Sequence, residues 1–125
     1  MKLFLVLGAA AAAIAVALGA FGAHGLKARI SSDMLAVWQT AVQYHAWHAL
    51  GLLAVGLSAV DFKSPWMTAA GWLLAAGIVL FSGSLYALAL GAPRILGAVT
   101  PFGGLAFILG WLAFAVGIIY ARTSG

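Results

Sequence analysis

Residues 66–91 read WMTAAGWLLAAGIVLFSGSLYALALG, a run that contains no charged side chain. Three further uncharged, mostly apolar stretches cover residues 3–22, 38–60 and 99–120. Each stretch is long enough to cross a hydrocarbon layer of about 30 Å at about 1.5 Å per helical residue. Lipid offers backbone groups no hydrogen-bond partner, so segments of this length must be helical. The sequence therefore predicts an all-α integral membrane protein, a bundle of four helices.

The composition leaves little room for any other domain. Of the 125 residues, 66% are hydrophobic and only 6% are charged, whereas soluble domains carry about 25% charged residues. The connections are short, which predicts antiparallel, up-down-up-down neighbours with both termini on one side. We expect a single transmembrane domain over residues 1–125, and its spans should cover about 3–25, 33–60, 65–91 and 100–121.

Local sequence signals mark the expected helix ends. The glycine-rich residues 19–25 predict the end of the first helix, and Ser31 is a typical N-cap for the second. Ser64 and Thr100 are each followed by proline, which predicts an N-cap and a first helical residue at both places. Residues 91–94, which contain glycine and proline, should end the third helix.

The formal net charge of +4 comes from basic residues at helix ends and in loops, where charges lie beside lipid headgroups. This placement argues against nucleic acid as a partner and favours membrane lipids. We call the side with both termini side A and the other side B. Lys27, Arg29 and Arg94 fall on side B and should face headgroups. Side A also has three basic residues, so the orientation stays open.

Small residues recur every seven positions in the last two stretches, which is typical of close helix packing in lipid. We expect these residues to lie at helix contacts: Gly77, Ser84 and Gly91 in one stretch, and Gly103, Gly110 and Gly117 in the other.

The polar side chains of the spans gather in the side-B half: His24, Thr40, Gln43, Tyr44, His45, His48, Ser82, Ser84, Tyr86 and Thr100. Because polar groups avoid lipid, the stripe on the second helix should face the bundle interior. His48 lies about 15 Å beyond Trp38, which we expect at the interface. Ser84 and Tyr86 are its expected hydrogen-bond partners. The group is either a network that fixes helix register or a pocket open to side B.

The histidines are an unpromising metal or haem site. His45 and His48 are three residues apart and can share a ligand, but a zinc site needs three or four protein ligands. The chain has no cysteine, and none of the four apolar stretches contains Asp or Glu. Ser82 and Ser84 likewise have no acidic residue to orient a histidine base. We therefore expect no metal, no cofactor and no catalytic residue.

Four ordered motifs carry a resemblance to a known family. They are GAFGAHGL at residues 19–26, WQTAVQY at 38–44 with His48-Ala49 after it, LFSGSLY at 80–86, and TPFGG at 100–104 with Gly110-Trp111 after it. Together they closely resemble the small membrane-protein family of unknown function that includes bacterial YgdD and YwdK. The resemblance implies a four-span, multi-pass protein of the bacterial inner membrane, and it implies no activity.

Three classes of function follow from these observations. The first is a non-catalytic structural or accessory membrane protein that contacts itself or a larger complex through its helices. The second is a binder or carrier of a small amphipathic anionic ligand or lipid, held in a polar pocket open to side B. An enzyme is the third.

Overall fold

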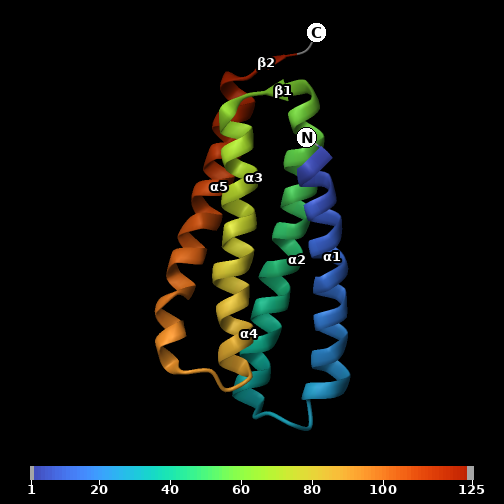
Figure 1. The fold of residues 1–125 in the computed structure, drawn as a ribbon, viewed down its shortest axis with the longest axis vertical. Coiled ribbons are helices and arrows are strands. Elements are labelled where there is room, and N and C mark those ends of the chain that lie inside the picture. The colour runs from blue at the N-terminus through green and yellow to red at the C-terminus, as the bar shows by residue number, and fades with distance from the viewer. Residues whose placement is uncertain (1, 124–125) are drawn as a thin grey trace.

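The computed structural model describes residues 2–123, and these form four long helical rods (Figure 1). The first rod is α1 (Lys2–Phe21) with the π-helical turn η1 (Gly22–Leu26), and the second is α2 (Ser32–Asp61). The third joins α3 (Pro65–Gly77), the π-helical η2 (Ile78–Ser82) and α4 (Gly83–Ala89) without a break. The fourth is α5 (Thr100–Tyr120), which follows the 3₁₀ turn η3 (Arg94–Ala98).

The rods stand side by side in the order α5, α3–α4, α2 and α1 (Figure 1). The most extensive contacts join α1 to α2 and α3 to α5. The two pairs meet where α2 packs against α3, η2 and α4. As a result α2 and the α3–α4 rod form the centre, and α1 and α5 flank it.

A short pair of strands joins the end of α2 to the end of α5. Strand β1 (Phe62–Lys63) follows α2 and pairs antiparallel with β2 (Arg122–Thr123), which follows α5. Gly56 near the end of α2 packs against Leu5 near the start of α1. The start of α1 and the end of α5 therefore lie at the same end of the molecule, beside the α2–α3 connection (Figure 1).

Three of the helices are long and apolar enough to cross a membrane: Lys2–Leu26, Pro65–Ala89 and Arg94–Tyr120. At 30 residues α2 is long enough as well, but it is not among them. Length and composition therefore support three of the four predicted spans, and the span at α2 stays a prediction. The reason is its first half, where polar side chains such as Gln43, His45 and His48 lower the mean hydropathy.

Two of the predicted helix starts are confirmed. Ser31 accepts a hydrogen bond from the backbone N–H of Met34 at 3.1 Å, and Ser64 accepts one from Trp66 at 3.1 Å. Thr100 was wrongly predicted as an N-cap. Val99 is the residue before α5, and no side chain caps this helix. The hydroxyl of Thr100 bonds to another helix instead.

The first helix ends close to the predicted place, since its α-helical part ends at Phe21, within the glycine-rich residues 19–25. The backbone continues through η1 with wider, π-helical turns, and the helix ends at Leu26. Gly91 does end its helix as predicted, because it takes the left-handed conformation with φ of 100°. That conformation is strained for any residue with a Cβ atom and is a common helix ending.

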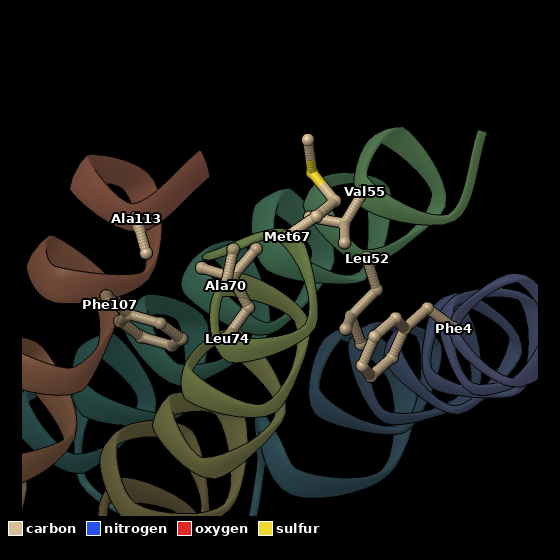
Figure 2. Close-up of a cluster of buried hydrophobic side chains, with 8 residues drawn as sticks. All are labelled: Phe4, Leu52, Val55, Met67, Ala70, Leu74, Phe107 and Ala113. Atoms are coloured by element: carbon tan, nitrogen blue, oxygen red, sulfur yellow. The ribbon is translucent and has the colours of Figure 1, made fainter. Parts of the chain in front are cut away.

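The main apolar core lies mostly in the side-A half and draws on every rod (Figure 2). Its buried members are Phe4, Leu52, Val55, Met67, Ala70, Leu74, Phe107 and Ala113. A second, smaller cluster of Leu26, Trp38 and Ala89 closes the side-B end. Only 3% of Trp38 is exposed, so its expected place as an interfacial anchor is corrected to a core position.

Glycines bring the rods into close contact. Gly77 faces the ring of Phe107, Gly110 faces Leu74, and Gly117 faces Met67. Gly103 lies against the backbone of Phe81 in η2, the closest of these approaches. Such contacts are the usual means of helix association in lipid.

Gly91 is the exception among the predicted packing glycines and needs a correction. It is exposed, and a Cβ atom built on it would have no neighbour within 4 Å. The α4 helix has already ended at Ala89, so Gly91 serves the turn rather than a helix contact.

We expect Gly110→Leu to lower the stability of the folded protein by more than about 1 kcal/mol through overpacking. A Cβ atom at Gly110 would lie 2.8 Å from Cδ2 of Leu74 and 3.3 Å from Cβ of Leu73. Thermal unfolding in detergent measures this effect. An unchanged melting temperature would contradict it, and Gly97→Leu, at a glycine with open space around it, is the control.

Candidate functional site

The buried polar side chains of the side-B half form hydrogen bonds between helices. Nδ1 of His45 on α2 lies 2.8 Å from the hydroxyl of Tyr86 on α4. The hydroxyl of Ser82 at the end of η2 donates to the carbonyl of Ala41 on α2 at 2.8 Å. Of these residues His45 is 4% exposed, and Ser82 is fully buried. These two bonds join α2 to the third rod.

Two further bonds reach the flanking rods. Ser84 and Thr100 join α4 to α5 through their hydroxyls, which lie 2.5 Å apart. The indole Nε1 of Trp38 donates to the carbonyl of Leu18 on α1 at 2.9 Å. Together with the His45–Tyr86 and Ser82–Ala41 bonds, we call these the interhelical hydrogen bonds. Each bond of this kind stabilises a membrane bundle by about 0.6 to 2 kcal/mol.

His48 does not bond to the third or fourth rod, so the expectation of Ser84 or Tyr86 as its partner is wrong. Its Nδ1 lies 2.6 Å from the carbonyl of Tyr44, one turn back on the same helix. Its ring stacks on Phe107 of α5 at a centroid distance of 3.5 Å. The expected partners are already used, because Tyr86 pairs with His45 and Ser84 with Thr100.

Three of the predicted pocket residues lie on the outside. His24, Thr40 and Gln43 are exposed. The Thr40 hydroxyl donates to the carbonyl of Ala36 on its own helix at 3.1 Å. The single inward polar stripe expected on the second helix is therefore split: His45 and His48 point inward, and Thr40 and Gln43 point outward.

Three grooves lie on the described surface at places away from the buried polar groups, and none of the three is lined by a histidine, by Ser82, by Ser84 or by Tyr86. One groove, of about 450 Å³, lies beside the α2–α3 connection. The other two, of about 560 and 390 Å³, lie between α1 and α2 and share Gly19 and Val42. Over residues 2–123 no three His, Cys, Asp or Glu side chains gather into a possible metal site.

The three basic residues assigned to side B are exposed at that end of the molecule. Lys27 and Arg29 lie in the turn between η1 and α2, and Arg94 begins η3. Side B also carries Asp33, in the first turn of α2. These side chains sit at the same end as the interhelical hydrogen bonds but belong to none of them.

Sequence reasoning missed the role of Trp38. Its indole packs against the tilted ring of Tyr86 at 4.7 Å between centroids and lies against Gly22 of η1. A Cβ atom at Gly22 would approach the indole to 2.6 Å. The glycines of residues 19–25 were therefore a signal for a large neighbouring side chain, but nothing in the sequence alone said which one.

The family described as protein of unknown function (DUF423) matches residues 18–104. The chain belongs to the DUF423 family. Among its relatives is the UPF0382 membrane protein YwdK of Bacillus subtilis, 53% identical over 120 residues, covering 95% of this chain and 98% of YwdK. A second is the UPF0382 membrane protein SSP2132 of Staphylococcus saprophyticus, 51% identical with 94% and 97% covered. No solved structure matches the chain.

The DUF423 match confirms the resemblance drawn from the four motifs. It contains all of their residues except Gly110 and Trp111, which lie beyond its end at residue 104. In this DUF423 protein the motifs meet one another in space. Gly22 of the first contacts Trp38 of the second, Ala41 of the second accepts a hydrogen bond from Ser82 of the third, and Ser84 of the third bonds to Thr100 of the fourth.

We expect Tyr86→Phe to lower stability by about 0.6 to 1 kcal/mol, since it removes one interhelical hydrogen bond and keeps the ring. It also leaves the His45 ring without its 2.8 Å partner. Unfolding in detergent measures the loss. Tyr120→Phe is the matched control, because Tyr120 is 76% exposed; equal effects of both changes would contradict the assignment.

Proposed function

We propose that this DUF423 protein is a multi-pass protein of the bacterial inner (plasma) membrane. Its four antiparallel helices cross the bilayer as one domain, with spans near 3–25, 33–60, 65–91 and 100–121 and both termini on side A. The names of its relatives, which call them membrane proteins, support this placement. So do the large apolar side chains on the outside, among them Val16 at 73% exposed, Val79 at 69% and Ile119 at 70%.

The second helix crosses with the others despite its polar residues. It occupies the centre of the bundle, packed between α1 and the α3–α4 rod. His45 and His48 are 4% and 6% exposed, so protein rather than lipid surrounds them. Polar groups are tolerated in a membrane where they face the bundle interior and have partners.

Within that membrane the protein acts as a non-catalytic structural or accessory protein through helix–helix contacts. One observation carries this proposal: the four family motifs contact each other through the Ser82–Ala41 and Ser84–Thr100 hydrogen bonds and through the close approaches of Gly22 to Trp38 and Gly103 to Phe81. The buried polar groups already have partners inside the protein, which suits a role in holding helices at fixed positions. The apolar outer faces remain for contacts with other membrane components.

A second candidate is the binding of a lipid or another amphipathic anionic molecule at side B. The larger groove between α1 and α2 favours it, since this groove is almost wholly apolar and wide enough for an acyl chain. Lys27, Arg29 and Arg94 would then attract the headgroup. Against it, side A carries as many basic side chains as side B.

Purification from native membranes in mild detergent, with mass spectrometry of the proteins and lipids that copurify, tests the two candidates. A protein partner in fixed ratio, whether this chain or another, supports the accessory role. Anionic lipid that is lost when Lys27, Arg29 and Arg94 are changed to Glu, but retained in Lys63→Glu, supports the binder. Equal lipid loss from both sides means general headgroup attraction and removes the second candidate.

A further inference from the structure

Two adjoining grooves between α1 and α2 share Gly19 and Val42, and we call them together the α1–α2 groove. It starts at the depth of Leu50, halfway along α2, and reaches Gln39 near side B. Residues of α1, η1 and α2 line it, and none of its lining residues comes from α3, α4 or α5. In a membrane this groove must contain either lipid or another helix.

Each wall of the groove has the spacing of a helix-packing seam. The α1 side presents Ala12, Val16, Gly19 and Ala23, and the α2 side presents Gln39, Gln43, Ala46 and Leu50. Both series advance by four, three and four residues, the repeat that keeps side chains aligned along a left-handed helix crossing. The α1 seam is made mostly of small residues, and the α2 seam mostly of large ones.

The two seams match in depth. Gly8 of α1 lies against Leu53 of α2, and Gly19 lies against Val42, so the antiparallel helices run in register. By this register Ala12 shares its depth with Leu50 and Gly19 with Gln43, to within about one residue. Val16 shares its depth with the small Ala46 in the same way. At each of these depths, therefore, one seam has a large residue and the other has a small one.

Polar groups in the groove indicate the kind of occupant. Gln43 lies about 16 Å along α2 from its start, and it is exposed on the outer face. Within residues 2–123 its amide has no hydrogen-bond partner, and neither has that of Gln39. An amide that faces acyl chains loses its hydrogen bonds to water. A partner with both a donor and an acceptor at that depth would restore them, and acyl chains have neither.

We propose that the α1–α2 groove binds the same groove of a second copy of this chain, forming a two-fold symmetric dimer whose axis is parallel to the membrane normal. Such an axis keeps every residue at its own depth. The α2 seam of each copy then packs on the α1 seam of the other. The two Gln43 side chains meet near the axis, where each amide can donate to and accept from its symmetry mate.

This inference rests on the proposed function, since it names the partner of the helix contacts. The self-complementary amide favours a second copy over an unrelated protein. The seams favour the same conclusion. In a second copy each residue lies at the same membrane depth, so the large residues of one seam already stand opposite the small residues of the other. Lipid alone fits less well, since most of the groove is apolar but Gln39 and Gln43 remain unpaired in it.

The first experiment is cross-linking in native membranes. The chain has no cysteine, so one tagged copy carries Ala23→Cys and a second, differently tagged copy carries Gln39→Cys. Both positions lie near side B, where thiols react with a short bismaleimide. We expect a cross-linked pair that carries both tags. As control, Ile95→Cys replaces Gln39→Cys, because Ile95 is 74% exposed near the same side, and it should give no pair.

The second experiment measures dimer dissociation of the whole chain in detergent by energy transfer between labelled copies. Gln43→Leu should raise the dissociation constant by about three- to tenfold. Its matched control is Thr40→Val, an outward polar residue that bonds to its own helix. Ala20→Leu fills the groove and should weaken the dimer, whereas Ala13→Leu, exposed outside the groove lining, should not.

The outcomes separate this inference from the proposed function. A monomer at every protein-to-detergent ratio, with no cross-link in membranes, overturns the dimer. A cross-link from Ala23→Cys to a different protein also overturns the dimer but leaves the accessory role intact. Equal cross-linking of the Ile95→Cys control means random collision and counts against the dimer as well.

Discussion

Gly103→Ala is expected to lower the free energy of unfolding by about 1 to 3 kcal/mol, the range for overpacked sites. A Cβ atom at Gly103 would meet the backbone nitrogen, Cα and Cβ of Phe81. Backbone atoms cannot rotate away as a flexible side chain can, so α5 would have to separate from η2. The same movement would stretch the nearby Ser84–Thr100 hydrogen bond.

The predicted loss of stability is informative because helix propensity alone favours alanine over glycine by about 1 kcal/mol. Without the close contact, the substitution would stabilise the protein. Gly83→Ala is the matched control, since a Cβ atom there would have no neighbour within 4 Å. We expect Gly83→Ala to be neutral or stabilising. Unfolding of both variants in the same detergent gives the comparison. If Gly103→Ala is as stable as Gly83→Ala, the close approach of α5 to η2 does not exist in the protein.

The sequence allowed the helices and several of their ends to be predicted because these depend on local chemistry. Ser31, Ser64 and Gly91 act through hydrogen bonds or backbone conformation within a few residues. Such signals do not depend on what packs nearby. Thr100 failed as a cap because its hydroxyl reaches Ser84, sixteen residues away in the chain.

The inward and outward faces could not be predicted with the same success. In a soluble helix the polar face marks the solvent side, but here both lipid and core are apolar. Thr40 and Gln43 were expected inside because polar groups avoid lipid, yet both are exposed on α2. The Thr40 hydroxyl donates a hydrogen bond to a carbonyl of its own helix. For the Gln43 amide, the proposed partner is the second copy of the chain.

The π-helical turns are the other feature beyond the reach of the sequence. A π-helical turn is wider than an α-helical one, so it rotates the residues after it relative to those before it. Gly77 and Ser84 lie on either side of η2, and both still contact α5, at Phe107 and Thr100, whereas Gly91 lies beyond the end of α4. Gly103, Gly110 and Gly117 lie within the uninterrupted α5, and all three face the third rod.

Trp38→Ala is expected to be the most destabilising single change outside the glycine contacts, by at least about 2 kcal/mol. In water such a truncation costs about 3 to 5 kcal/mol. In lipid the transfer part of that cost is small, because acyl chains are as apolar as the core. The cavity remains, next to Phe21 and Tyr86, and the carbonyl of Leu18 loses its donor.

Two further variants separate these contributions. Trp38→Phe keeps an aromatic ring in the second cluster and removes the bond to Leu18, so it should cost about 0.6 to 2 kcal/mol. Trp47→Ala removes the same side chain from the same helix at a site that is 50% exposed. We expect it to cost less than about 1 kcal/mol, since lipid fills the space that the indole leaves. A loss in Trp47→Ala as large as that in Trp38→Ala would mean that Trp38 does not hold α1 against α2, and the side-B end of the bundle would then need another explanation.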